Sequence, residues 1–222
     1  MIEISKKKLS KMIDHTNLKP DATQQDIINL CKEAKEYGFC AVCISPMYIS
    51  LAHELLKDTD VKVDSVAGFP LGYTFTKVKA FETKKLIESG ADETDMVINL
   101  IALKQKNYSL VLDDIKAVVK AAKGKTVKVI LETCYLTDKQ IIKACKLSKE
   151  AGAHFIKTST GFGPSGAKVE HVKLMRETVG EKMGVKAAGG IRTFDDAIRF
   201  IKAGANRIGT SSGVAIIEGF EK

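Results

Sequence analysis

The stretch that decides the fold class is residues 127–159, VKVILETCYLTDKQIIKACKLSKEAGAHFIKTS. It begins with a short apolar run rich in β-branched residues, and a second such run closes it at residues 154–159. Between the two runs, Thr137-Asp-Lys-Gln140 has the pattern of a helix capping box, and Ala151-Gly152 is typical of the end of a helix. The stretch therefore predicts a strand, a helix and a second strand.

Similar apolar runs recur along the whole chain, and their starts are roughly 20 to 35 residues apart, which suits one strand, one helix and two loops. The predicted strands are Ile13–Leu18, Ala41–Ser45, Val61–Phe69, Glu93–Leu100, Val127–Glu132, His154–Ser159, Val185–Ala188 and Arg207–Thr210. Eight such units predict an α/β fold of the (β/α)8, or TIM-barrel, type. Because Ile13–Leu18 is short and polar, an open doubly wound sheet with fewer strands is the alternative.

The chain has 222 residues and only four prolines, and no flexible linker divides it, so we expect one domain over residues 1–222. No apolar run approaches the roughly 20 residues needed to span a bilayer, and no apolar segment follows the lysines near the N-terminus as in a signal peptide. We therefore expect a cytoplasmic protein without a membrane partner. Five cysteines, an odd number, indicate reduced thiols, and the pair Cys40 and Cys43 lies in an apolar run, which disfavours a redox or metal role.

The net charge of +8 allows an anionic partner. The lysines are scattered along predicted helices without dense basic runs or interleaved aromatic residues, and tryptophan is absent. This pattern disfavours a nucleic-acid partner and is compatible with a small phosphorylated substrate.

Two lysines stand where a strand favours an apolar residue: Lys157 in His154–Gly163 and Lys186 in Gly184–Arg192. A lysine pressed under a helix has no route to solvent, so the alternation of side chains along a strand predicts that both point into the barrel. The same parity points Asp95 inward. The two lysines then lie on neighbouring strands, about 5 Å apart.

Two ammonium groups about 5 Å apart at an effective dielectric of about 20 repel each other by roughly 3 kcal/mol. Such repulsion favours a state in which one lysine is charged and the other is a neutral, nucleophilic amine, as Schiff-base chemistry requires. The spacing does not say which lysine is which. The structural alternative is that each lysine forms an ion pair with a carboxylate or reaches solvent at the end of its strand.

Glycines follow the last three predicted strands, in Thr160–Gly163, at Gly189 and Gly190, and in Gly209–Gly213. Exposed amides after the last strands of a barrel often hold a phosphate group, although glycines can also serve only tight turns. The four histidines show no zinc-ligand spacing, and no dinucleotide or nucleotide motif is present. We expect neither a metal nor a cofactor.

Four segments together are similar to the motifs of one enzyme family. They are Phe155-Ile-Lys-Thr-Ser-Thr-Gly161, Val185-Lys-Ala-Ala-Gly-Gly-Ile-Arg192, Ala91-Asp-Glu-Thr-Asp-Met-Val97 and Gly209-Thr-Ser-Ser212. The chain resembles the 2-deoxyribose-5-phosphate aldolases over nearly its whole length.

The resemblance implies a role for each candidate residue. Lys157 looks like the Schiff-base lysine, Lys186 like the lysine that lowers its pKa, Asp95 like the acid/base partner, and Asp14 like a polar residue that contacts substrate. The segments implied to hold phosphate contain Gly161, Gly189, Gly190, Arg192, Gly209, Ser211 and Ser212. Phe162 stands where some members of the family carry a lysine, which would shift phosphate binding toward backbone amides and Arg192.

The resemblance also implies a cofactor-free, reversible cleavage of 2-deoxy-D-ribose 5-phosphate in deoxyribose phosphate catabolism, by a homo-oligomer, with a dimer as our expectation. Two alternatives stay open. One is another lysine-dependent sugar-phosphate aldolase or a transaldolase, and the other is a barrel that binds sugar phosphates without catalysis.

Overall fold

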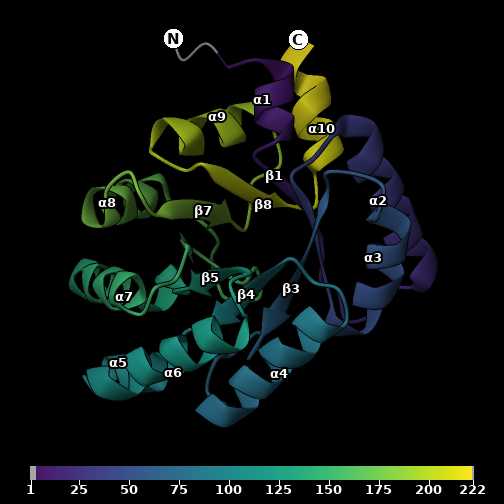
Figure 1. Ribbon diagram of the computed structural model, residues 1–222. Coiled ribbons are helices and arrows are strands. Elements are labelled where there is room, and N and C mark those ends of the chain that lie inside the picture. The colour runs from purple at the N-terminus through teal and green to yellow at the C-terminus, as the bar shows by residue number, and fades with distance from the viewer. Residues whose placement is uncertain (1–3, 222) are drawn as a thin grey trace.

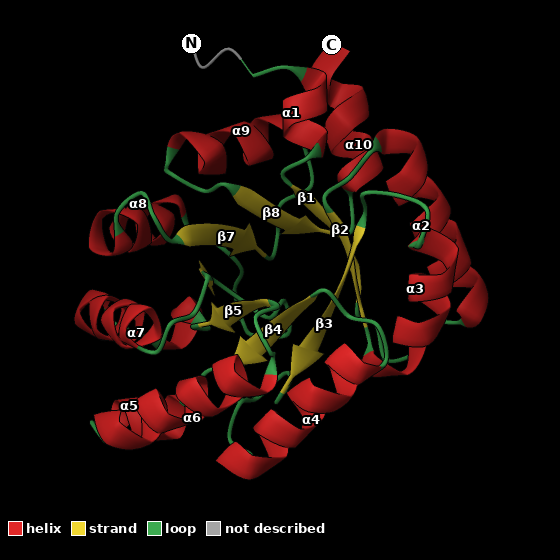
Figure 2. Ribbon diagram, in the orientation of Figure 1, coloured by secondary structure: helices red, strands yellow, loops and turns green. Residues whose placement is uncertain are grey.

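The structure is a computed structural model that describes residues 4–221, and over these residues a closed barrel of parallel strands forms the centre of the molecule (Figures 1 and 2). The strands follow one another around the barrel in chain order, and β1 pairs with both β2 and β8. The strands are β1 (Ile13–Asn17), β2 (Ala41–Ile44), β3 (Lys62–Ala67), β4 (Glu93–Val97), β5 (Thr126–Ile130), β6 (Phe155–Lys157), β7 (Gly184–Ala188) and β8 (Arg207–Thr210). The predicted (β/α)8 barrel is confirmed, and the open sheet is excluded because β1 closes the ring.

Helices surround the barrel on the outside, as Figure 2 shows in red. They are α1 (Lys6–Ser10), α2 (Gln24–Tyr37), α3 (Ile49–Leu56), α4 (Thr76–Glu88), α5 (Leu100–Lys104), α6 (Tyr108–Ala121), α7 (Asp138–Glu150), α8 (Val169–Val179), α9 (Phe194–Lys202) and α10 (Gly213–Glu218). Three short 3-10 helices are η1 (Pro46–Tyr48), η2 (Thr133–Tyr135) and η3 (Gly219–Glu221). Helices α1 and α10 lie side by side, near the two ends of the drawn chain (Figure 1). The single domain predicted for residues 1–222 includes residues 1–3 and 222, which lie outside the described part.

Local sequence signals set the helix boundaries. The predicted capping box at Thr137 is present at the start of α7, where the Thr137 side chain accepts from the amide of Gln140 and the Gln140 side chain accepts from the amide of Thr137. A second capping box joins Thr193 and Asp196 at the start of α9. Gly38 ends α2 in the left-handed conformation, at φ 65°, which glycine adopts without steric cost. These boundaries were readable from the sequence because each depends on residues within one turn.

Three strands, β3, β4 and β6, are each three residues shorter than predicted, and in β4 the reason is visible. The prediction extended that strand to Leu100, but the Asn99 side chain accepts a hydrogen bond from the amide of Ala102 and so caps α5, which begins at Leu100. Strand β3 ends at Ala67, and β6 covers only residues 155–157. The predicted ends of β3 and β4 were wrong because apolar residues such as Phe69 and Ile98 continue into the following loops, and the end of β6 was wrong because the buried residues Thr158 and Ser159 follow it.

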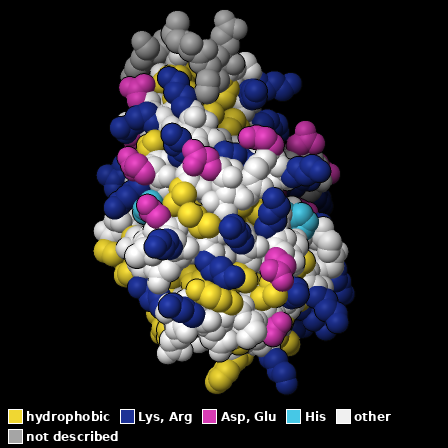
Figure 3. All heavy atoms as spheres, turned by 90° about the vertical axis from the view of Figure 1, so that its left-hand side faces the viewer, with side chains coloured by type: hydrophobic (Ala, Val, Ile, Leu, Met, Phe, Trp, Pro, Cys, Tyr) yellow, Lys and Arg dark blue, Asp and Glu magenta, His cyan; other side chains and the backbone are white. Residues whose placement is uncertain are grey.

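Side chains alternate between the helix-facing and inward-facing sides of each strand. Met96 and Ile98 belong to the hydrophobic core between strands and helices, whereas Asp95 points into the barrel. On the face drawn in Figure 3, lysine and arginine side chains lie dispersed among acidic and uncharged ones. Within residues 4–221, none of the helices combines the length and apolar character needed to cross a bilayer.

Candidate active site

Lys157 and Lys186 lie next to each other inside the barrel, because β6 and β7 pair with these two residues in register. The ammonium nitrogens lie 2.7 Å (Lys157) and 2.8 Å (Lys186) from the same oxygen, Oδ2 of Asp95 on β4. All three side chains are almost fully buried, and Lys157 retains 3% exposure. The structure therefore brings the three predicted catalytic residues into one hydrogen-bonded group. Both lysines form ion pairs, as the structural alternative required, and both bind the carboxylate of Asp95.

Lys186 is enclosed by negative charge. Besides Asp95, its ammonium lies 2.5 Å from Oδ2 of Asp14 and 3.1 Å from Oδ2 of Asp64. Burial by itself lowers the pKa of Lys186, but Asp14, Asp64 and Asp95 outweigh burial and hold this pKa well above its ordinary value. Lys186 is thus a permanently charged group at neutral pH.

A third interior lysine, Lys128 on β5, was not predicted. Its ammonium lies 2.6 Å from Glu93, 2.7 Å from Oδ1 of Asp95 and 2.9 Å from Asp64, and the side chain is completely buried. Burial lowers the pKa of Lys128, but Asp64 and Asp95 raise it above its ordinary value overall. Lys128 therefore binds Asp95 on the side opposite the two predicted lysines.

The ion-pair network inside the barrel contains equal numbers of carboxylates and cations among the described residues. The carboxylates are Asp14, Asp64, Glu93 and Asp95, and the cations are Lys128, Lys157, Lys186 and Arg207. Arg207 on β8 pairs with Asp14 at 2.7 Å, and its guanidinium group lies over the ring of Phe155. Balanced pairing of this kind is what allows so many charges to be buried together.

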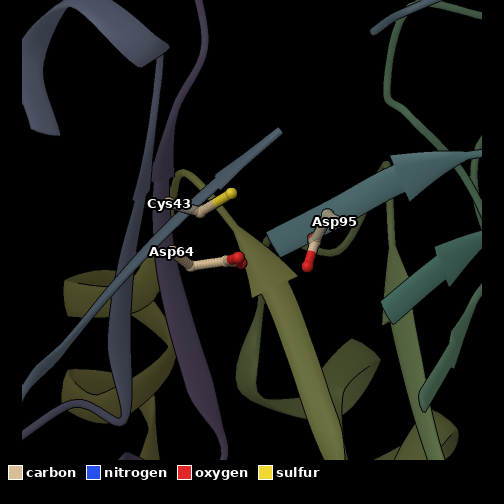
Figure 4. A group of neighbouring side chains, drawn as sticks. All are labelled: Cys43, Asp64 and Asp95. Atoms are coloured by element: carbon tan, nitrogen blue, oxygen red, sulfur yellow. The ribbon is translucent and has the colours of Figure 1, made fainter. Parts of the chain in front are cut away.

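The same carboxylates make clusters with the spacing of metal ligands. Figure 4 shows the side chains of Cys43 and Asp64 extending toward Asp95, and their ligand atoms lie within 4.8 Å of one another. However, Asp64 and Asp95 already accept hydrogen bonds from ammonium groups, and Lys128 and Lys186 would repel a divalent cation here. Burial first, and the charge of Asp64 second, raise the pKa of the Cys43 thiol well above its ordinary value, so this thiol is neutral. We interpret the cluster as an ion-pair network.

The pKa values of the carboxylates differ although their surroundings are similar. Burial raises the pKa of Asp95, but Lys128, Lys157 and Lys186 together hold it well below its ordinary value. Burial also raises the pKa of Asp14, while Lys186 and Arg207 lower it overall. Asp64 is the exception, because burial and the nearby charge of Asp95 raise its pKa to about 6 in spite of Lys128 and Lys186.

A cavity of about 570 Å³ opens above Lys157 at the carboxyl ends of the strands. Of the residues implied to hold phosphate, Gly161, Gly189, Gly190, Arg192, Gly209 and Ser211 line this cavity. Ser212 and Asp14 are not among the lining residues; Ser212 precedes α10, and Asp14 is fully buried under Lys186. Most of the predicted binding residues therefore share one cavity with Lys157, while Asp14 contacts the lysine network.

Two glycines in this cavity are required by close approach. Gly189 has φ 91°, and a Cβ atom there would lie 2.9 Å from the backbone of Gly166, so the loops after β6 and β7 pack directly on each other. A Cβ atom at Gly209 would lie 3.0 Å from Cε of Lys186, so Gly209 leaves room for that side chain to enter the barrel. Phe162 also lines the cavity, and its ring packs edge-on against Phe69. This position of the cavity wall therefore carries no charge.

Glu132, two residues after the end of β5, was also missed. It has left-handed backbone angles, φ 51° and ψ 63°, which are unfavourable for a residue with a side chain. Its buried carboxylate accepts hydrogen bonds from the amide and the hydroxyl of Thr160, and the Thr160 hydroxyl accepts from the amide of Phe162. Glu132 thus anchors the loop that forms one wall of the cavity.

The missed charged residues carried the same signal as Lys157. Lys128 stands between Val127 and Val129, and Asp64 follows Val63, so both are charges at inward positions of apolar runs. Applying the alternation rule to every strand would have found both. Nothing local marks Glu132, because its partner Thr160 is 28 residues away.

Comparisons with known proteins agree with this geometry. The model of the DeoC/LacD family aldolases matches residues 8–219. The chain belongs to this family. A deoxyribose-phosphate aldolase of Thermococcus kodakarensis is 61% identical over 220 residues, which cover 97% of this chain and 98% of the relative. The chain is accordingly an aldolase, a carbon–carbon lyase.

Solved structures show the same fold. A putative deoxyribose-phosphate aldolase from Coccidioides immitis superimposes with a TM-score of 0.95 at 44% identity, covering 99% of this chain and 88% of the other. A deoxyribose phosphate aldolase from Aeropyrum pernix, described as having a unique tetrameric structure, gives a TM-score of 0.91 at 39% identity, with coverage of 98% and 93%. The aldolase family is therefore supported by sequence and by architecture.

Proposed function

We propose that this aldolase reversibly cleaves 2-deoxy-D-ribose 5-phosphate to D-glyceraldehyde 3-phosphate and acetaldehyde through a Schiff base on Lys157. The observation that carries the proposal is the position of Lys157, whose ammonium is bound to Asp95 while the side chain borders the cavity. Lys186 does not border the cavity and is surrounded by carboxylates, so Lys157 is the better nucleophile. The names of the relatives support the choice of substrate.

The reaction follows from the charges around Lys157. The neutral amine adds to the aldehyde carbon of the open-chain sugar, and loss of water gives an iminium that accepts electrons from the C2–C3 bond as it breaks. The C2 and C3 atoms separate as the hydroxyl group on C3 loses its proton, which Asp95 can relay because it contacts Lys157 and Lys186. The remaining enamine is protonated and hydrolysed to acetaldehyde. Lys186 keeps positive charge next to Lys157 throughout.

The phosphate group of the substrate would lie at the glycine-rich wall of the cavity. Gly161, Gly189 and Gly190 line this wall, where backbone amides would bind the phosphate, and Arg192 supplies a positive charge. Ser211 borders the same wall, and Ser212 follows it in the chain. Binding this remote group aligns the reacting bond over Lys157.

Borohydride trapping with acetaldehyde tests the proposal. A reduced ethyl group is expected on Lys157, located by peptide mass spectrometry, and Lys157→Ala should abolish both trapping and cleavage of deoxyribose 5-phosphate. Trapping only with dihydroxyacetone phosphate or pyruvate would favour another lysine aldolase. Binding of the sugar phosphate without turnover would favour a barrel that binds sugar phosphates without catalysis, and a label on another lysine would contradict the assignment of the nucleophile.

We also propose that the protein works as a cytoplasmic homo-oligomer, a dimer in the simplest case, in deoxyribose phosphate breakdown. Large apolar side chains are exposed between β3 and α4 and along α4, which is typical of a surface that another subunit covers. They are Leu71, Tyr73, Phe75, Val78 and Phe81. Analytical ultracentrifugation of the native chain and of a Phe75→Asp variant tests this: the variant should dissociate, and an unchanged mass would exclude this surface.

A further inference from the structure

The proposed Schiff-base chemistry, on which this inference rests, changes the charge of the Lys157 nitrogen repeatedly. The nitrogen is neutral in the attacking amine, positive in the iminium and neutral again in the enamine. Because this ion-pair network holds four carboxylates and four cations, each neutral form leaves one carboxylate of the network without a counter-charge. An uncompensated buried charge is strongly unfavourable. The network therefore needs a group that takes up a proton when Lys157 loses its charge.

Asp64 on β3 is connected to Lys157 by two paths of ion pairs and hydrogen bonds. Its Oδ2 lies 2.9 Å from Lys128 and 3.1 Å from Lys186, and each of these ammonium groups also binds Asp95. Asp95 in turn binds Lys157 at 2.7 Å. Each path thus runs from Lys157 through Asp95 and one lysine to Asp64.

Asp64 is better suited to hold a proton than its neighbours. Asp14 is bound by both Lys186 and Arg207, and Asp95 is bound by three lysines, so their pKa values stay low. Asp64 is completely buried, and its Oδ1 atom has no hydrogen-bond partner among the described residues, so this oxygen is free to carry a proton. Burial and Asp95 raise its pKa to about 6.

We propose that Asp64 is the proton store of the barrel interior: its carboxylate takes up a proton when the nitrogen of Lys157 becomes neutral and releases it when the iminium forms. In the first step an N–H bond of Lys157 breaks, and its electron pair stays on nitrogen. The proton passes to Asp95 while Lys186 or Lys128 gives a proton to Asp64 and is reprotonated from Asp95. The net change is one N–H bond lost at Lys157 and one O–H bond gained at Asp64. In the second step the stored proton returns and leaves with the hydroxyl group of the carbinolamine as water.

Asp64 faces charged and titratable groups from five other strands. They are Asp14 on β1, Cys43 on β2, Glu93 and Asp95 on β4, Lys128 on β5 and Lys186 on β7. Helices α3 and α4 pack against the opposite, apolar side of β3, which includes Val63. Cys43 does not compete for the proton in the same pH range, because its thiol remains neutral there. Figure 4 shows Cys43 and Asp64 directed into the space beside Asp95.

Titration of Asp64 in the protein without substrate tests whether its protonation depends on the charge of Lys157. With aspartate labelled by carbon-13 at the carboxyl group, the signal of Asp64 is the one that Asp64→Asn or, if that variant does not fold, Asp64→Ser removes. We expect it to titrate near pH 6 in the native chain. Lys157→Met removes a positive charge and should raise the titration by about one pH unit or more. Lys173→Met, at an exposed lysine on α8, is the matched control and should not move it.

Trapping on Lys157 then tests the role of the store in catalysis. Below about pH 6, Asp64 is already protonated and cannot accept the proton of Lys157, so the rate of borohydride trapping with acetaldehyde should fall. In Asp64→Asn this acid limb should disappear from the profile. Any one of three results would overturn the proposal. Asp64 could stay ionised down to pH 4, its titration could be unchanged in Lys157→Met, or the acid limb could be unchanged in Asp64→Asn. If the native chain did not cleave deoxyribose 5-phosphate but Asp64 titrated as expected, the proposed function alone would be refuted, because the titration does not depend on substrate.

Discussion

Replacing Lys128 by methionine tests the idea that balanced pairing holds the charged interior together. Methionine has a similar length, so packing is largely kept and the ammonium is what is lost. Lys128 has three carboxylate partners between 2.6 and 2.9 Å, and none of them has solvent to replace it. Breaking a buried ion pair by removing one partner destabilises proteins by about 3–5 kcal/mol. For a domain of this size that corresponds to a fall in Tm of about 6–20 °C.

The loss of stability should depend on pH in a defined direction. Lys128 has a raised pKa, so its contribution is fully present below the unfolded value near 10.4 and is intact at pH 8. Asp95 has a lowered pKa, so its contribution is present above about pH 4 and is lost as the pH falls further. Without Lys128, the pKa values of Asp64 and Asp95 rise, and protonation at lower pH relieves the uncompensated charge. The variant should therefore be destabilised more at pH 8 than at pH 5.

Guanidinium unfolding of the native chain and of Lys128→Met at pH 8 and pH 5, at constant ionic strength, measures both effects. Lys173→Met should change the free energy of unfolding by less than about 0.5 kcal/mol at either pH, as expected for an exposed lysine. A loss below about 1 kcal/mol at pH 8, or an equal loss at both pH values, would refute the reasoning, because it would mean that the carboxylates do not depend on Lys128.

Three further substitutions probe other contacts. Glu132→Gln keeps the shape but removes the negative charge that strengthens both hydrogen bonds from Thr160, so KM for deoxyribose 5-phosphate should rise about tenfold with a smaller change in kcat. An unchanged KM in steady-state assays would argue against an anchoring role. Lys186→Leu should lower kcat/KM by about a hundredfold and shift the pH optimum upward, and a rate close to that of the native enzyme would exclude it from catalysis. Lys79→Met leaves the buried carboxylate of Asp114 without its counter-charge and should lower the free energy of unfolding in denaturant by about 3–5 kcal/mol. The double variant with Asp114→Leu should recover most of this loss. No recovery would show that packing, and not charge, explains the effect.

Much of the fold was predictable because its signals are local. Capping boxes at Thr137 and Thr193 and the glycine at the end of α2 act within one turn, and the alternation along a strand acts between neighbouring residues. These signals were sufficient for the repeat of strand and helix, and for the inward direction of Lys157, Lys186 and Asp95. The ends of β3 and β4 were less predictable, because apolar residues continue into the following loops, and the end of β6 was less predictable because buried residues follow it.

The sequence by itself thus determined a (β/α)8 aldolase with two inward lysines, since period and motif are properties of the chain. Only the tertiary structure decided which charges meet. Asp95 and Lys157 are 62 residues apart, and Lys186 and Asp64 are 122 residues apart, yet barrel closure brings each pair within hydrogen-bond distance. The number of residues between two such partners does not predict their contact, because the distance between them depends on strand order, register and the length of each side chain. For that reason the sequence predicted the inward lysines and Asp95, and the structure was needed to show the other charges around them, Asp64, Glu93 and Lys128.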